Sequence, residues 1–292
     1  HFSSQTGFMG ASKSTVSLVI QNSDRISAET KYKVRQAIEK LGYVPNIAAR
    51  ELITNKTHTI GLIFFTANHL KKPYSFDSVP ETLFYDTYNG ICNEIRSTDY
   101  SIVTERFSFT NGVKELPYII KQRRIDGLFL IGGLFVSDFI ELLKGFDIPT
   151  VIVGRAYEGM DCVCVDAELV GYMGTKHLID KGHRNILFVN GPKNSPNSVL
   201  KHGGALRAAR EAGGGVNLKA VNSGYTGEES YGVLKSVLDK GYIPDGILAG
   251  SDGITAGAMR LLYEKKIRVP EDISIVGYEN SLLSAYSPIS LT

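Results

Sequence analysis

Runs of apolar, β-branched residues recur along the sequence from residue 59 onward. They cover residues 59–65, 101–106, 127–131, 150–154, 162–166, 185–189, 246–250 and 273–277. Between them lie stretches with apolar residues at helical spacing, such as residues 170–182 and 199–213. Strands that are apolar along their whole length are typical of parallel sheets covered on both faces by helices. The pattern therefore predicts an α/β body.

The predicted strands are too many and too dispersed for one compact mononucleotide-binding fold. We therefore expect two lobes, an N-terminal lobe over residues 59–160 and a C-terminal lobe that begins at residue 161. A cleft between two such lobes is a natural place for a small ligand. The first predicted strand is not followed by a G-x-G-x-x-G pattern, so the sequence gives no support for a nucleotide cofactor, and none is expected.

Before residue 59 the sequence favours two short helices and no strand. Ser12 and Ser27 are placed to cap the N-termini of these helices, and residues 21–26 between them have the composition of a turn. The inward-facing residues are expected to be Val16, Val19 and Ile20 in the first helix and Val34, Ile38 and Leu41 in the second. This spacing resembles a helix-turn-helix.

Charge is distributed unevenly between this head and the body. Residues 1–58 contain eight Lys and Arg against four acidic residues, whereas the remainder is slightly acidic. A basic head indicates a polyanionic partner, although a solvated charged face would give the same pattern. The chain has no apolar run close to the roughly 20 residues of a membrane span, and its first ten residues do not resemble a secretory signal. We expect a cytoplasmic protein with no membrane contact.

The three cysteines, Cys92, Cys162 and Cys164, are too few for a disulfide framework, and no nearby His pair completes a zinc site. No metal is expected. Because Cys162 and Cys164 are two residues apart in a predicted strand, we expect them to share one face of it as small hydrophobic side chains.

The segment "GASKSTVSLVIQNSDRISAETKYKVRQAIEKLGYVPNIAARELITNKTHTIGLI" resembles the head and hinge of the LacI/GalR family of bacterial transcriptional regulators. The resemblance continues through "RRIDGLFLIG", "IPTVIVGR", "PDGILAGSDGITAGAMRLL" and "IRVPEDISIVGYEN". It implies a helix-turn-helix DNA-binding head in residues 1–45, a hinge helix and linker in residues 46–58, and a two-lobed body similar to periplasmic sugar-binding proteins.

The resemblance also implies a function. The protein would be a homodimeric repressor, not an enzyme, that binds operator DNA and senses a small-molecule effector in the body, with a sugar or sugar phosphate expected. One competing interpretation is a solute receptor that has the same body and no DNA role, against which the basic head argues. An α/β enzyme is the other, but the sequence lacks a nucleophile-base-acid constellation.

Three features depart from the family pattern. Residues 1–9 do not resemble the first helix of the head, which is therefore expected to be missing or replaced. Family members continue past the position equivalent to Thr292, so the C-terminal lobe is expected to end at residue 284, with residues 285–292 beginning a shortened crossover. Leu18 stands where many members carry Arg, and Leu cannot make the bidentate contact that Arg makes with guanine. Base preference at that position is expected to shift toward a thymine methyl group.

The DNA-contacting residues implied by the resemblance lie in the recognition helix and in the hinge. In the recognition helix we expect base contacts from Lys13, Ser14 and Leu18 and phosphate contacts from Ser12, Thr15 and Ser17. In the hinge, Asn46 caps a short helix, Ala49 allows a close approach, and Leu52 is the wedge pushed into the minor groove. A helix this short needs DNA and a second copy to form. The alternatives are exposed polar residues on a surface helix and a disordered linker.

The effector contacts implied by the resemblance are Arg155, Lys201, Tyr225, Asp252 and Glu279. Lys201 replaces an Arg of other members, which keeps a donor but loses the planar fork. Asp252 and Glu279, the latter where Asp is usual, would accept hydrogen bonds from hydroxyl groups, and Tyr225 would stack on a ring. Each residue has an alternative role: an ion pair for Arg155, solvated charges for Lys201 and Glu279, a helix N-cap for Asp252, and packing for Tyr225.

Overall fold

The computed structural model describes residues 12–20, 22–41, 56–67, 81–109, 116–132, 137–285, 287, 289 and 291. By internal contacts the chain divides into two compact units, residues 1–57 and residues 58–292. Within the described residues the first unit contains helices and the second is α/β. The predicted α/β class, with a small helical head, is therefore confirmed. The predicted hinge residues Asn46, Ala49 and Leu52 lie outside the described residues.

The head consists of α1 (Lys13–Ile20) and α2 (Ala28–Lys40). Val16, Val19 and Val34 form its buried core. Ser27 caps α2 as predicted, because its side chain accepts a hydrogen bond from the Thr30 amide. The expectation that Leu41 joins the buried stripe is wrong: α2 ends one residue before it, and its side chain is 44% exposed. The stripe holds as far as Ile38, which packs against the cluster of Val16, Val19 and Val34.

The first part of the body, called the N-lobe here, is a five-stranded parallel sheet with the strand order β2-β1-β3-β4-β5. Its elements are β1 (Thr59–Ala67), α4 (Glu81–Ile95), β2 (Ser101–Phe109), α5 (Tyr118–Lys121), β3 (Gly127–Ile131), α6 (Ser137–Lys144), β4 (Thr150–Val153) and β5 (Asp161–Val163). The chain enters this sheet at His58, whose amide donates to the Asp126 carboxylate (2.8 Å) and whose carbonyl accepts from the Ser101 amide (2.8 Å).

The second part, called the C-lobe here, is a four-stranded parallel sheet with the order β7-β6-β8-β9. Its elements are α7 (Ala167–Asp180), β6 (Asn185–Asn190), α8 (Pro196–Glu211), β7 (Asn217–Asn222), α9 (Gly227–Asp239), β8 (Gly246–Ala249), α10 (Asp252–Glu264), β9 (Ser274–Val276) and α11 (Leu282–Ala285). In both lobes the first strand lies inside the sheet, between the second and third strands.

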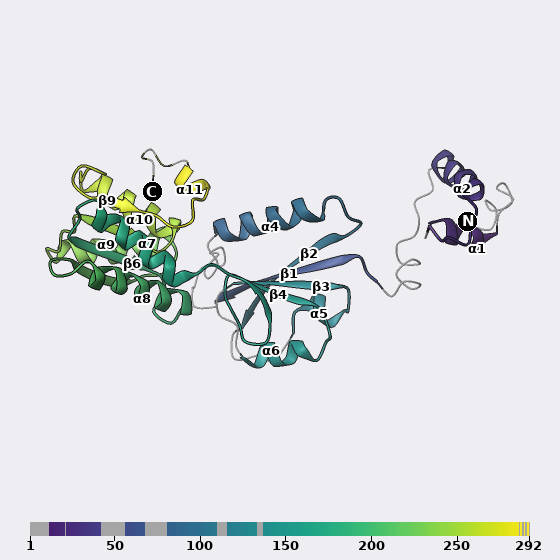
Figure 1. Cartoon of the computed structure of the whole chain (residues 1–292), viewed down its shortest axis with the longest axis horizontal. Helices are drawn as coiled ribbons and strands as arrows, with labels where there is room; N and C mark the ends of the chain where they lie inside the picture. The colour runs from purple at the N-terminus through teal and green to yellow at the C-terminus, as the bar shows by residue number, and fades with distance from the viewer. Residues whose placement is uncertain are drawn as a thin grey trace. The chain divides into compact units, whose positions relative to one another are not determined.

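Alternate residues of the central strands pack against helices on opposite faces, as continuous apolar strands require. In β6, Leu187 and Val189 belong to the cluster under α9 and α10, whereas Ile186 and Phe188 belong to the cluster under α7 and α8. The N-lobe repeats this arrangement, and Figure 1 shows α4 on one side of its sheet and α5 and α6 on the other. No helix in the described part of the chain is long and apolar enough to cross a bilayer.

Two glycines allow α7 and α8 to pack with their backbones in contact. A Cβ atom at Gly171 of α7 would collide with the carbonyl of Lys201, and one at Gly204 of α8 would collide with the carbonyl of Glu168. Only glycine permits such an approach without moving one helix. This contact fixes α8, which follows the carboxyl end of β6.

We predict that Gly204→Ala lowers the free energy of unfolding by about 2 kcal/mol or more, because the added methyl group meets backbone atoms that cannot rotate away. Gly203→Ala is the matched control. A Cβ atom at Gly203 meets nothing within 4 Å, so this change should be neutral or raise the free energy of unfolding by about 0.5–1 kcal/mol through helix propensity. Urea denaturation measures both, and equal effects of the two substitutions would contradict the proposed close approach.

Candidate effector site and nucleic-acid interface

Polar residues gather at the carboxyl edge of the C-lobe sheet, where the strands give way to loops. Asn190 ends β6, Tyr225 follows β7, Gly250 follows β8 and Glu279 follows β9. Because β6 pairs with β7 on one side and β8 on the other, the winding of the sheet reverses at β6. Open α/β sheets bind ligands outside the carboxyl ends of their strands at such a reversal. We call the group Lys201, Tyr225, Tyr278 and Glu279 at this edge the C-lobe edge cluster.

Lys201 is a buried lysine at the centre of this edge. Its side chain belongs to α8 and is 5% exposed, and its Nζ donates a hydrogen bond to the Gly250 carbonyl at 2.7 Å. The same Nζ lies 3.7 Å from the centroid of the Tyr278 ring, within the range of a cation–π contact. Burial lowers the pKa of Lys201 to about 8, and the negative charge of Glu279 opposes this change. The alternative of a solvated charge therefore does not hold for Lys201.

Asp252 is directed toward the loop that carries Glu279. Its carboxylate accepts hydrogen bonds from the Ser281 amide (2.8 Å), the Ser281 hydroxyl (2.6 Å) and the Glu279 amide (3.3 Å). The Glu279 carboxylate in turn accepts from the Asp252 amide at 3.2 Å. Burial raises the pKa of Asp252, but the bonds from Ser281, Glu279 and Tyr278 outweigh it, and the pKa is lowered overall. This geometry makes Asp252 the residue that holds Glu279 in position.

The N-cap of α10 is Ser251, whose hydroxyl accepts from the Ile254 amide at 3.2 Å. Asp252 is the first helical residue, so the alternative that Asp252 caps the helix is wrong. The physical reason is the extended backbone at Ser251, which turns its hydroxyl, and not the next carboxylate, toward the free amides of the first turn.

The ring of Tyr225 lies against the carboxyl end of β6, where a Cβ atom at Gly191 would overlap it. Its hydroxyl is within hydrogen-bond distance of the hydroxyls of Ser195 (3.1 Å) and Ser198 (3.4 Å). The pKa of Tyr278 is raised to about 12, first by burial and then by Glu279 and Tyr225. Glu279 and Tyr225 are thus near enough to Tyr278 to influence its ionisation. Tyr278 is not among the residues predicted from the sequence, and its position next to Glu279 in "VGYEN" was the available signal.

Arg155, the remaining predicted effector residue, belongs to the N-lobe and follows β4. Its guanidinium lies 5.9 Å from the centroid of the Tyr157 ring. The neighbouring Gly154 carbonyl accepts a hydrogen bond from the side-chain amide of Asn197 in α8, at 2.9 Å. The chain next to Arg155 is thus tied to the same helix that carries Lys201.

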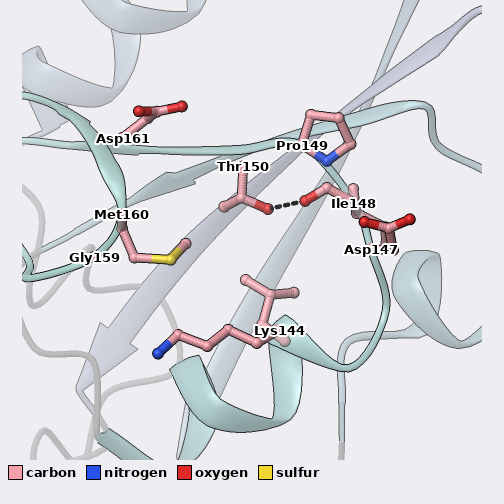
Figure 2. A pocket seen from close by; sticks show the side chains of 9 residues that line it. Lys144, Asp147, Ile148, Pro149, Thr150, Gly159, Met160 and Asp161 are labelled. Carbon is pink, nitrogen blue, oxygen red and sulfur yellow. Dashed lines mark hydrogen bonds between the residues drawn. The ribbon is translucent and has the colours of Figure 1, made fainter.

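A cavity of about 590 Å³ lies elsewhere, at the amino ends of β4 and β5 in the N-lobe (Figure 2). Its lining is Leu143, Lys144, Asp147, Ile148, Pro149, Thr150, Gly159, Met160 and Asp161. The Thr150 hydroxyl donates to the Ile148 carbonyl (2.8 Å) and Lys144 pairs with Glu141, so these polar groups are already satisfied within the lobe. None of the predicted effector residues lines this cavity, and ligands of parallel sheets bind at the opposite, carboxyl edge. We therefore do not assign it to the effector.

In the head, α1 exposes polar residues at its N-terminal end. Ser12 caps the helix, since its hydroxyl accepts from the Thr15 amide at 3.2 Å, and it also lies 2.6 Å from the Ser14 hydroxyl. Ser14 is exposed, and Ser17 and Leu18 are half-buried one turn further along. Lys13 is the first residue of α1. The N-terminal residues of a recognition helix are the ones that reach base edges in the major groove, and this end of α1 is open to do so.

The described residues contain no group of three or more His, Cys, Asp or Glu side chains able to hold a metal ion.

Two family models match the chain. Residues 9–46 match "Bacterial regulatory proteins, lacI family", and residues 175–292 match "Periplasmic binding protein-like domain".

The chain is also similar to characterised regulators along almost its whole length. It is 30% identical to the HTH-type transcriptional repressor PurR of Pasteurella multocida (96% of this chain, 82% of that protein). It is 31% identical to the PurR of Actinobacillus pleuropneumoniae (96% and 81%). Among solved structures, the lac repressor dimer bound to operator and the anti-inducer ONPF superposes with a TM-score of 0.77 at 22% identity, over 99% of this chain and 84% of that one. This last likeness concerns the fold.

A helical head followed by two parallel α/β lobes defines the class of regulators that join a DNA-binding unit to a ligand-binding body. With the family model and these relatives, the chain belongs to the lacI family of bacterial regulatory proteins. It is a DNA-binding transcriptional repressor and not an enzyme, as the sequence predicts.

We predict that Lys201→Met raises the free energy of unfolding at pH 7 by about 1–3 kcal/mol, because it removes the cost of burying a charge. The folded-state pKa of about 8 lies below the ordinary value, so the cost is fully present below pH 8 and falls as the pH rises toward the ordinary value. Urea denaturation should therefore show a smaller gain at pH 9.5. Lys240→Met, at an exposed helix end, is the control and should change little at either pH. A destabilised Lys201→Met protein would contradict this account.

Proposed function

We propose that this protein is a homodimeric repressor whose affinity for operator DNA is controlled by a small molecule bound at the C-lobe edge cluster, with Arg155 contributed by the N-lobe. The observation that carries the proposal is the buried Lys201 at the reversal point of the sheet. A buried charge lowers stability, so its presence is best explained by a role in binding. As a regulator of transcription, the protein works in the cytoplasm, where bacterial DNA is.

The chemistry of the cluster favours a small polar ring compound. Lys201 supplies a charged donor and Glu279 a charged acceptor, while the rings of Tyr225 and Tyr278 supply flat apolar surface. Carbohydrate-binding sites commonly combine a carboxylate, which accepts hydrogen bonds from two hydroxyl groups, with an aromatic ring that stacks on the pyranose face. A sugar or sugar phosphate is therefore the first candidate effector. The transcriptional regulator CelR, which has a similar fold (TM-score 0.64, 24% identity), has been solved in complex with cellobiose.

A purine is the second candidate. The relatives at 30% and 31% identity carry the name PurR, and a purine base has both a stacking face and the mixed donors and acceptors that Lys201 and Glu279 would pair with. The two candidates differ in thickness and in hydroxyl number, so a ligand screen separates them.

On DNA, we assign base contacts to Lys13, Ser14 and Leu18 and phosphate contacts to Ser12, Thr15 and Ser17 at the N-terminal end of α1. Asn46, Ala49 and Leu52 would form a short hinge helix that becomes ordered when two copies meet over the operator. Effector and operator then compete or cooperate through the hinge. Such coupling requires that the effector bind the two arrangements of the dimer with different affinities. The factor by which the effector changes operator affinity then equals the factor by which the operator changes effector affinity.

A thermal-shift screen tests the effector site. A sugar, sugar phosphate or purine that binds only the folded protein raises the melting temperature by mass action. We expect one of these classes to do so in the parent protein, and Glu279→Gln to abolish the shift by removing the charged acceptor. Glu271→Gln is the control, since Glu271 is exposed near the amino end of β9. A shift that survives Glu279→Gln undiminished would place the effector elsewhere.

Operator binding by the hinge is tested separately. Leu52→Ala should weaken binding to a selected operator by about tenfold or more, because the minor-groove wedge is lost. The effector-induced melting shift should stay as in the parent. Leu41→Ala, which truncates an exposed leucine just after α2, serves as the control in the head. Fluorescence anisotropy measures the operator affinity of the parent, Leu52→Ala and Leu41→Ala proteins, and a thermal-shift assay measures their response to the effector. An unchanged operator affinity for Leu52→Ala would show that Leu52 is not a minor-groove wedge.

A further inference from the structure

The C-terminal end of α1 in the head (Figure 1) is closed by Asn22, whose backbone lies in the left-handed region (φ 54°). The Asn22 amide donates to the Val19 carbonyl (3.0 Å), and the Ser23 amide donates to the Leu18 carbonyl (3.0 Å). This pair of bonds is the Schellman arrangement, in which the left-handed residue is usually glycine and sometimes asparagine. Asn22 therefore closes α1 with a residue that, unlike glycine, has a side chain able to bond to another element.

Two cations of α2 bond to Asn22. The Arg35 guanidinium donates through Nη2 to the side-chain carbonyl of Asn22 (Oδ1) at 2.9 Å, and Lys31 Nζ donates to the main-chain carbonyl of Asn22 at 3.1 Å. Lys31 and Arg35 are four residues apart and so lie on one face of α2. Because α1 has no basic residue in its own last turn, these two side chains supply the positive charge that favours a helix C-terminus.

These bonds add a second point of attachment to a small core. Three buried valines, Val16, Val19 and Val34, hold α1 against α2. α1 has only eight residues, which is too few for a helix that persists alone in water. Val16 and Val19 lie on one face of α1, whereas the bonds to Asn22 lie beyond its end. One attachment allows α1 to pivot on α2, and two attachments set its direction.

The direction of α1 matters because specific contacts tolerate little error in geometry. A binding group must be held within about 0.5 Å and 10–20° of its productive position. Lys13 and Ser14, which we assign to base contacts, lie at the opposite end of α1 from Asn22. A rotation of α1 about its core would therefore displace these side chains from the base edges while leaving the head folded.

We propose that Asn22 and Arg35 position the recognition helix for reading operator bases, with Arg35 acting through Asn22 and not as a phosphate ligand. The inference rests on the proposed role of α1 in base contacts. A phosphate contact is the alternative for an exposed arginine on a basic head. The bond from Arg35 to Asn22 Oδ1 favours the positioning role, because it directs the guanidinium to the end of α1.

The test measures operator affinity and non-specific affinity separately, by fluorescence anisotropy with the full chain. The two duplexes are an operator selected in vitro with the parent protein and a shuffled duplex of the same length and composition. We expect Asn22→Gly, which keeps the left-handed backbone and removes Oδ1, to weaken operator binding by at least about fivefold, the lower end for one specific base contact. Binding to the shuffled duplex should stay within about twofold of the parent, because phosphate contacts carry it.

Arg35→Met should produce the same loss, and the double variant should lose no more than either single variant, because both changes remove one interaction. The slope of log K against log salt should not change in Arg35→Met. Asn22→Asp retains an acceptor for Arg35 and tolerates the left-handed region, so it should bind the operator within about twofold of the parent. Lys40→Met, which removes a cation at the C-terminal end of α2, is the control for net charge and should bind the operator as the parent does. Circular dichroism at the assay temperature verifies that each variant is folded.

Four results would overturn the inference. These are an unchanged operator affinity in Asn22→Gly, additive losses in the double variant, a loss in Lys40→Met as large as that in Arg35→Met, and a salt slope that falls by about 0.9 in Arg35→Met, as expected for a lost phosphate contact. Lys13→Ala separates this inference from the proposed function. If Lys13→Ala weakens operator binding and Asn22→Gly does not, only the positioning role fails. If neither variant weakens it, α1 is not the recognition helix and both proposals fail.

Discussion

The close approach of α7 and α8 at Gly171 and Gly204 is the constraint on which the candidate effector site depends. The carbonyl that a side chain at Gly171 would strike is that of Lys201 itself. The contact therefore sets the position of Lys201 along the edge of the sheet, at hydrogen-bond distance from the Gly250 carbonyl. A wider spacing between the helices would draw the amine away from β8 and from the Tyr278 ring.

Two buried charges at this edge have opposite effects on stability. Asp252 is surrounded by donors, so its ionised form is stabilised and it anchors the loop that carries Glu279. Lys201 has one carbonyl and one ring as partners, and its ionised form is disfavoured. A fully satisfied ion organises a site, whereas an incompletely satisfied one remains available to a ligand. This contrast separates the positioning residue from the proposed binding residue.

The head and the body differ in the size of their cores and in the polar groups that they present. The head has a core of a few valines and presents a helix end whose hydroxyls suit phosphate and base edges. The body has large cores on both faces of each sheet and can hold buried charges. Joining them in one chain allows a small free energy of ligand binding in the body to change the affinity of the head for DNA, provided that the two states bind the ligand differently.

Sequence alone determined the class of the fold, because continuous apolar strands and capped helices are local patterns whose physical meaning does not depend on distant residues. It also placed the candidate site residues at strand ends and in the first helix. It could not determine what each side chain meets. Three findings depend on the order of the strands and on how closely two helices approach: Lys201 is buried, Asp252 bonds to the loop that carries Glu279 and does not cap α10, and Tyr278 joins the cluster. Burial and hydrogen bonding between residues tens of positions apart arise only from tertiary packing.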